Sequence, residues 1–311
     1  NMNINCYYEL ANCDWNVSRY FESIFNALKQ HYTEFTIEKV STESLRANSI
    51  DPSSKFEHHN MIIENVESKK YFLITYLDKM SGICEYTGWD MENCVEIFTS
   101  SGVHDNDVYY NPLNINNYTP FSYLTSRLDV DETCDKLSMV ANQERVIPNK
   151  PMFKGKLYLF REYLKQDDRF NVLSTDDGEY LPFPDYIRHL NKYAINMSLN
   201  GAGEICYRDM EIMRLGTALF RPKLVTRFNE PLIPNYHYIS VDYDSIKDEL
   251  NPETFYKLKS DLMIQRWDEV IKDRDYIDEV SKNGKAWFER NGTKEKHAEI
   301  ALELVNFDKL K

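Results

Sequence analysis

Short apolar runs alternate with segments of helical periodicity through most of the chain. Residues 4–10 form the first run, and apolar side chains then recur at steps of three and four from Val17 to Leu28. This pattern predicts a strand, a short polar connection and a helix with one broad apolar face. Because the alternation returns in the second half of the chain, we predict an α/β protein of the doubly wound type. Further strands are predicted at residues 35–40, 61–66, 71–77, 95–99, 170–174, 193–198, 217–220 and 238–241, and further helices at 157–164, 204–215, 252–273, 274–290 and 293–310.

The length of 311 residues indicates two domains of about 150 residues each. Residues 142–151 include two prolines and no helical pattern, so we place the domain boundary there. The first domain is then expected at residues 1–147 and the second at 148–293, and the helix at 294–311 is expected to pack back on the first. Residues 101–120 lack periodicity and predict a long irregular loop, a candidate wall of a cleft.

Charge and glycine content argue against several classes of function. Lysine and arginine number 37 against 50 aspartates and glutamates, a net charge of −13, so there is no basic excess for a nucleic-acid partner. The chain has 10 glycines and neither G-x-G-x-x-G nor G-x-x-x-x-G-K-[ST], which argues against a dinucleotide fingerprint or a P-loop. It also lacks a run of 18 apolar residues and a signal-peptide pattern, so we expect a cytoplasmic protein without a membrane span. The six cysteines form no C-x-x-C pair and are expected to be free thiols.

The segment after the predicted strand at 193–198 is the sharpest candidate for a binding site. Gly201 and Gly203 predict a small-residue turn between a strand end and a helix start, where unpaired backbone N–H groups and the helix dipole suit a diphosphate. Arg208 and Glu211 lie three residues apart, on nearly the same helical face. Arg208 could therefore hold phosphate oxygens while Glu211 accepts hydrogen bonds from ribose hydroxyls. Alternatively, the charged side chains of this helix form only surface ion pairs.

A resemblance to a known family rests on this segment and on the strand after it. The turn, the arginine, the glutamate three residues on and the L-G-T-A-L-F-R-P of residues 215–222 resemble the donor-binding domain of GT-B glycosyltransferases, above all of the exostosin-like and CAP10-like groups. Residues 150–161, 237–243 and 283–288 resemble other parts of that domain. The resemblance covers about residues 148–290. The N-terminal half matches weakly, and the whole resembles the small glycosyltransferases of large algal viruses, among them a β-xylosyltransferase.

The resemblance implies a GT-B fold, in which two Rossmann-like domains face each other across a cleft and a C-terminal helix crosses back. The first domain would bind a glycan acceptor and the second a nucleotide sugar, with transfer of one sugar, xylose from UDP-xylose, by inversion and without a metal or other cofactor. Lys154, Lys156, Arg161 and Arg208 become candidates for the donor diphosphate, with Glu211 on the ribose. Lys154-Gly155 stands where relatives often have Arg-Gly. Residues 180–183 are a candidate contact for the nucleobase.

Inverting transfer needs a carboxylate or histidine that takes the proton from the acceptor hydroxyl. Doubly wound folds bind ligands at the carboxyl ends of their strands, and three candidates follow predicted strands of the first domain. They are Asp14, Asp78 and His104. In the alternative interpretation Asp14 caps a helix, Asp78 is a turn residue and His104 is a polar loop residue.

Two other functions remain open from the residues alone. D-x-D pairs, which metal-dependent glycosyltransferases use to hold a divalent cation on the donor, occur at 105/107, 129/131, 242/244 and 273/275. In a chain so rich in aspartate the motif has little specificity. The second alternative is a non-catalytic protein that binds a carbohydrate or a nucleotide.

Overall fold

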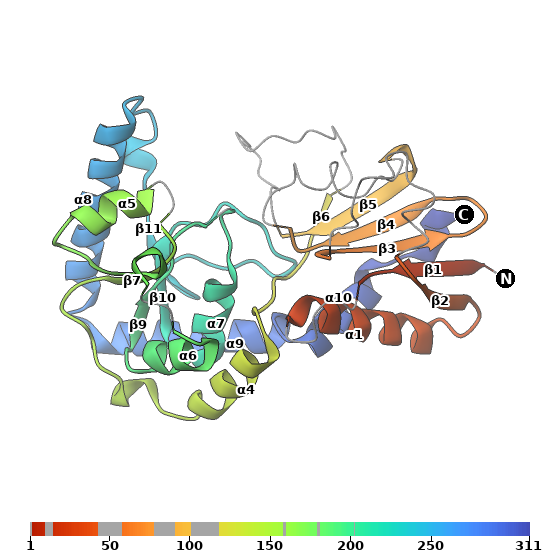
Figure 1. Cartoon of the computed structure of the whole chain (residues 1–311), viewed down its shortest axis with the longest axis horizontal. Coiled ribbons are helices and arrows are strands. Elements are labelled where there is room, and N and C mark those ends of the chain that lie inside the picture. Colours follow the sequence, from red (N-terminus) through yellow and green to blue (C-terminus); the bar gives the residue numbers. More distant parts are fainter. Residues whose placement is uncertain are drawn as a thin grey trace. The chain divides into compact units, whose positions relative to one another are not determined.

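The computed structural model describes residues 2–9, 15–42, 58–77, 91–100, 118–157, 160–178, 181–201 and 203–311 (Figure 1). The chain divides into two compact units. Unit 1 comprises Asn1–Leu128, Thr226–Pro231 and Arg290–Lys311, and unit 2 comprises Asp129–Val225 and Leu232–Glu289. Residues 129–147, which the sequence analysis placed in the first domain, therefore belong to unit 2.

Unit 1 contains a six-stranded mixed sheet. Its strands, in the order β2-β1-β3-β4-β5-β6, are β2 (Thr36–Val40), β1 (Asn3–Tyr7), β3 (Asn60–Asn65), β4 (Tyr71–Thr75), β5 (Cys94–Thr99) and β6 (Tyr118–Pro120). β3 is antiparallel to both of its neighbours, and the other pairs are parallel. The α/β class is confirmed, but β3 departs from a doubly wound pattern. The reason is its short connection to β4, which turns at Lys69 with a φ of 62° and cannot hold a parallel crossover.

Two helices at opposite ends of unit 1's sequence pack together beside this sheet, α1 (Asn16–His31) and α10 (Lys294–Leu304) (Figure 1). The apolar face expected for α1 is buried. On α10, His297 is fully buried among the rings of Tyr20, Tyr76 and Phe121. Its Nδ1 lies 2.6 Å from Tyr76 Oη in a hydrogen bond. These aromatic side chains thus belong to a core that joins the two helices to the sheet.

Unit 2 is built on parallel strands. They are β7 (Met152–Gly155), β8 (Asn171–Ser174), β9 (Ile195–Met197), β10 (Ala218–Pro222) and β11 (Ile239–Val241). β7 pairs with β8, and β10 lies between β9 and β11. An isolated parallel bridge between Val146 and Tyr193 joins the segments that precede β7 and β9. In this bridge Val146 N donates to Lys192 O (2.9 Å), and Ala194 N donates to Val146 O (2.8 Å). The strands form two sheets, β7-β8 and β9-β10-β11, and the contacts of β7 with β9 place them side by side in the order β8-β7-β9-β10-β11. This is a doubly wound order whose direction reverses between β7 and β9.

Helices connect and cover these strands. They are α4 (Leu128–Leu137), α5 (Phe160–Gln166), α6 (Phe183–Asn191), α7 (Tyr207–Leu215), α8 (Pro252–Val270) and α9 (Arg274–Asn291), with short 3₁₀ turns at Asn142–Glu144, Thr175–Asp177 and Asp244–Ile246. Two further 3₁₀ turns, Met91–Asn93 and Phe307–Leu310, belong to unit 1. α5 packs against α8, and α6 packs against α7 (Figure 1). Met263, Trp267 and Val270 of α8 enter the core with the buried strand residues. The β/α alternation predicted for this half is confirmed, although α7 begins three residues later than expected.

We expect unit 1 to lose stability in acid because of His297. Burial lowers the pKa of this imidazole to about 3, whereas an unfolded histidine titrates near pH 6.5. Below that pH the unfolded chain binds a proton that the folded chain does not, so the free energy of unfolding falls, by about 2 kcal/mol at pH 5 from this group. Urea denaturation of the wild type and of His297→Gln at pH 7 and pH 5 measures the effect. The variant should lose less stability between the two pH values, and an equal loss would contradict the assignment.

Candidate functional site

A cavity of about 360 Å³ opens in unit 2 at the carboxyl ends of β7 and β8. It is lined by Lys154, Gly155, Lys156, Thr175, Asp176, Leu181, Phe183, Tyr186 and Arg208. β7 is one of the two strands between which the strand order reverses, and crevices at such a reversal are where open α/β sheets bind their ligands. The fold therefore points to this cavity as the candidate site of unit 2.

Arg208 of α7 lines the cavity, and one nitrogen of its guanidinium has no hydrogen-bond partner among the described residues. Its Nε donates to Tyr186 Oη at 3.0 Å, and its guanidinium lies over the rings of Phe153 and Tyr186, 5.2 and 5.9 Å from their centroids. Burial raises the pKa of the Tyr186 phenol, so the hydroxyl stays neutral and accepts this bond. Nη1 is buried and has no hydrogen-bond partner in the part of the chain that the structure describes. A buried donor without a partner is costly in free energy, and an anionic ligand would relieve that cost.

Gly155 makes the position of Arg208 possible. Its φ is 144°, and a Cβ atom built on it would lie 2.7 Å from Arg208 Nη2. Side chains rarely adopt this backbone conformation, and glycine adopts it without strain. The guanidinium can therefore approach the backbone at the end of β7.

The charge of the cavity lining is locally positive. Lys154, whose side chain is buried, and Lys156, which is exposed, both line the cavity with Arg208, and Asp176 provides the one carboxylate of the lining. The potential in a cleft depends on nearby charges rather than on the net charge of the chain. The lining can thus bind an anion although the chain carries a net charge of −13.

Thr175 and Asp176 line the cavity at the end of β8, and the sequence analysis did not single them out. Thr175 Oγ1 is buried and has no hydrogen-bond partner among the described residues. Asp176 is exposed, its N–H donates to Ser174 Oγ (3.1 Å), and its Oδ2 accepts from Leu157 N (2.8 Å). The signal that could have found this pair is its place directly after the second strand of a βαβ unit.

Arg161, expected on the diphosphate, has another role in the structure. The residue is 4% exposed, and its guanidinium lies 4.5 Å from the centroid of Phe153. Nη1 donates to Lys156 O (3.0 Å) and Nη2 to Leu199 O (2.8 Å). Arg161 does not line the cavity. It joins the loop after β7 to the loop after β9 and so positions Lys156.

The predicted turn and helix start lie outside the cavity lining. Gly201 N donates to Gly203 O (3.0 Å), closing the turn, but neither glycine lines the cavity. The backbone N–H of Cys206, just before α7, donates to Asp209 Oδ2 (2.8 Å), so the helix satisfies this group itself. Glu211, expected on the ribose, is 3% exposed and is also outside the lining. The structure thus brings Lys154, Lys156 and Arg208 together and leaves the rest of the expected donor set apart.

A buried ion pair fixes the same loop from the side of β10. Arg221 of β10 and Asp209 of α7 are both fully buried and lie 2.6 Å apart. Arg221 Nη2 also donates to Asn200 Oδ1 (3.1 Å) and to Glu204 O (2.9 Å). The pair thereby ties the end of β10 to the β9–α7 loop and to the first turn of the helix that carries Arg208.

The three candidate bases, Asp14, Asp78 and His104, lie outside the described residues, as do the D-x-D pair at 105/107 and residue 180 of the expected nucleobase contact. Described members of the other D-x-D pairs are bonded within the chain. Asp131 pairs with Arg214 (3.1 Å), Asp242 Oδ1 accepts from Asp244 N (2.8 Å), and Asp273 Oδ1 accepts from Tyr276 N (3.0 Å). These bonds give the motifs local structural roles.

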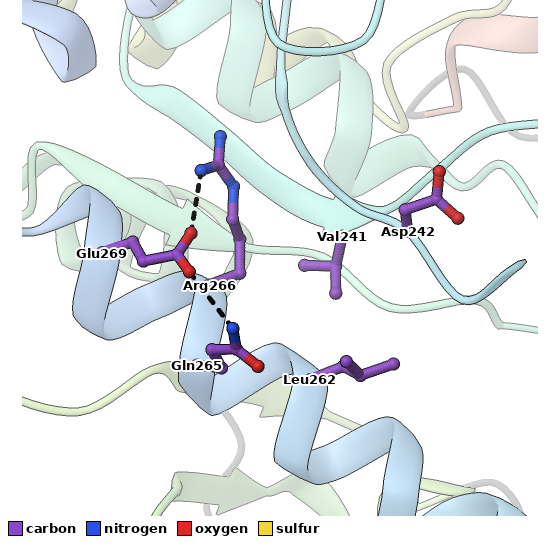
Figure 2. Close-up of a pocket in the computed structure, with 6 residues that line it drawn as sticks. All are labelled: Val241, Asp242, Leu262, Gln265, Arg266 and Glu269. Carbon is purple, nitrogen blue, oxygen red and sulfur yellow. Dashed lines mark hydrogen bonds and ion pairs between the residues drawn. The ribbon is translucent and has the colours of Figure 1, made fainter. Parts of the chain in front are cut away.

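A second, smaller cavity of about 150 Å³ lies between the end of β11 and α8. Figure 2 shows Gln265 and Arg266 both bonded to Glu269, with Asp242 apart from them. Arg266 also donates to Asn235, and Asp242 pairs with Lys223 at 3.3 Å. Because its charged groups already have partners, this cavity offers a ligand less than the one at β7 and β8.

Comparison with models of known protein families and with curated proteins found no match. Across the described ranges, no group of three or more histidine, cysteine, aspartate and glutamate side chains is arranged to hold a metal ion. Nor does any helix in those ranges combine the length and the apolar character needed to cross a bilayer. The chemistry of the site is therefore argued from its own residues.

Gly155→Ala should affect both stability and anion binding. Alanine is strained at positive φ, at a cost of about 1 kcal/mol or more, and its Cβ would displace the Arg208 guanidinium. Gly178→Ala is the matched control, because Gly178 has a φ of 81° but a Cβ atom built on it would have nothing within 4 Å. Urea denaturation should show a loss in both variants, whereas calorimetry with inorganic pyrophosphate should show weaker binding only in Gly155→Ala. Equal pyrophosphate affinity in the two variants would contradict this account of Gly155.

Proposed function

We propose that unit 2 binds a nucleotide sugar through its diphosphate and that the protein is a glycosyltransferase, which moves one sugar to a glycan hydroxyl. The observation that carries the proposal is the cationic cavity at the reversal of strand order, where Arg208 holds a buried unpaired N–H beside Lys154 and Lys156. A diphosphate supplies acceptors for all three cations. Following the resemblance in the sequence, UDP-xylose is the proposed donor.

The remainder of the lining supports a ligand larger than an inorganic anion. Leu181, Phe183 and Tyr186 give the cavity apolar and aromatic surface, which suits the flat faces of sugars and bases. The cavity volume of about 360 Å³ lies within the usual range for small-molecule sites. A phosphorylated organic molecule matches this lining better than phosphate alone.

The proposed reaction requires cationic side chains that contact the diphosphate, which is the leaving group. The acceptor hydroxyl attacks the anomeric carbon and gives its proton to a base, while the bond from that carbon to the diphosphate oxygen breaks. Arg208, Lys154 and Lys156 would stabilise the negative charge that develops on the departing diphosphate. In this proposal side chains do so without a metal, and the configuration at the anomeric carbon inverts. Asp14, Asp78 and His104 remain the proposed bases in unit 1.

Arg208→Gln should weaken donor binding. Loss of a charge-assisted contact to phosphate should lower affinity by about 10- to 100-fold, measured by thermal shift with UDP, GDP, CMP and their sugars. Arg188→Gln is the control, because Arg188 is exposed on α6 and pairs with Asp185 (2.5 Å) without lining the cavity. Transfer or donor hydrolysis by the wild type should persist in EDTA.

Each alternative has its own signature in these assays. Unchanged affinity in Arg208→Gln contradicts the placement of the donor. Strict dependence on Mn²⁺ favours a metal-dependent glycosyltransferase. Binding of a nucleotide sugar with no turnover over a broad acceptor set favours a non-catalytic binding protein.

A further inference from the structure

β7, α5 and β8 form a parallel βαβ unit whose two strand ends border the cavity. Gly155 ends β7, and Asp176 is the second residue after β8. In such a unit a ligand that lies across the end of the first strand meets the side chain that follows the second, and an acidic residue about 20 positions on accepts the ribose hydroxyls of a nucleotide. Asp176 stands at about that distance from Gly155, although the chain lacks the glycine fingerprint of dinucleotide-binding folds.

Hydrogen bonds within the chain orient the carboxylate of Asp176, which can still accept further hydrogen bonds from a ligand. The N–H of Asp176 donates to Ser174 Oγ (3.1 Å) and its Oδ2 accepts from Leu157 N (2.8 Å), and these two bonds hold the residue at the cavity. Its Oδ1 has no hydrogen-bond or ion-pair partner within the residues that the structure describes. An ionised carboxylate can accept about four hydrogen bonds, so the hydroxyls of a ligand can use the remaining positions.

Thr175, the residue before Asp176, is a second polar residue of the cavity lining. Its Oγ1 is buried without a partner among the described residues, and a hydroxyl can both donate and accept. The two neighbouring hydroxyls of a vicinal diol can each donate one hydrogen bond and accept another. The adjacent pair of a carboxylate and a hydroxyl therefore matches a diol, whereas a phosphate, which only accepts, would be repelled by Asp176.

Glu211, the residue expected to bind the ribose, is unsuited to this role. It is 3% exposed and does not line the cavity, whereas Asp176 is exposed and does. We propose that Asp176, aided by Thr175, binds the vicinal hydroxyls of the ligand's ribose and makes the site selective for ribonucleotides over deoxyribonucleotides. This assignment rests on the proposed nucleotide-sugar function.

The test compares Asp176→Asn with the wild type. Asparagine keeps an oxygen for Leu157 N, so the local structure is retained, but it removes the charged acceptor. Isothermal titration calorimetry with UDP, GDP, their 2′-deoxy counterparts and inorganic pyrophosphate gives the affinities. The wild type should bind its preferred ribonucleotide at least about ten-fold more tightly than the deoxy form. The variant should lose most of that preference and bind pyrophosphate at least as tightly as the wild type, because a negative charge has gone.

Asp177→Asn is the matched control. Asp177 is the next residue, is exposed, pairs with Lys165 and does not line the cavity, so this variant should keep the preference of the wild type. If Asp176→Asn also keeps it, or if the wild type binds ribo and deoxy forms equally, the assignment is overturned while the proposed function stands. If the wild type binds neither nucleotides nor pyrophosphate, the proposed function fails and this assignment fails with it.

Discussion

The ion pair between Arg221 and Asp209 is the interaction on which the site in unit 2 depends. Both side chains are fully buried, and removal of either would leave an uncompensated charge in the core, at a cost of about 3–5 kcal/mol. The pair holds the first turn of α7 against β10, and Arg208 lies on that turn. The position of the cavity's guanidinium is thus set by a pair that does not itself line the cavity.

The three buried arginines of unit 2 differ in role from Arg208. Arg145, Arg161 and Arg221 donate to backbone carbonyls or to a side-chain amide oxygen, and these bonds satisfy the ends of strands and helices that would otherwise be unpaired. Arg208 differs because one of its nitrogens stays unused beside a cavity. An acidic chain can therefore contain a cationic site without a basic surface, since most of its buried guanidiniums act within the fold.

Periodicity predicted much of this fold because it reports which side chains are buried. The apolar spacing from Val17 to Leu28 places the buried face of α1 correctly, and the β/α alternation of unit 2 is found in the structure. Strand direction was harder to predict from the sequence, although the short link at Lys69 already favours an antiparallel pairing of β3 and β4. Arg208 lines the cavity, but the glycine turn that the pattern placed beside it does not. Helical spacing put Glu211 beside Arg208 but could not show that the rest of the fold covers Glu211. Asp176 belongs to no motif, and only its place after the second strand of a βαβ unit could have indicated it.

The packing of α1 on α10 also bears on how the chain is completed during synthesis. α1 ends at His31, but the helix that covers its apolar face begins only at Lys294. All of unit 2 lies between them in sequence, from Asp129 to Glu289. The unit whose strands leave the ribosome first is therefore the unit whose core closes last, and its exposed aromatic residues must avoid other partners until the C-terminal segment emerges.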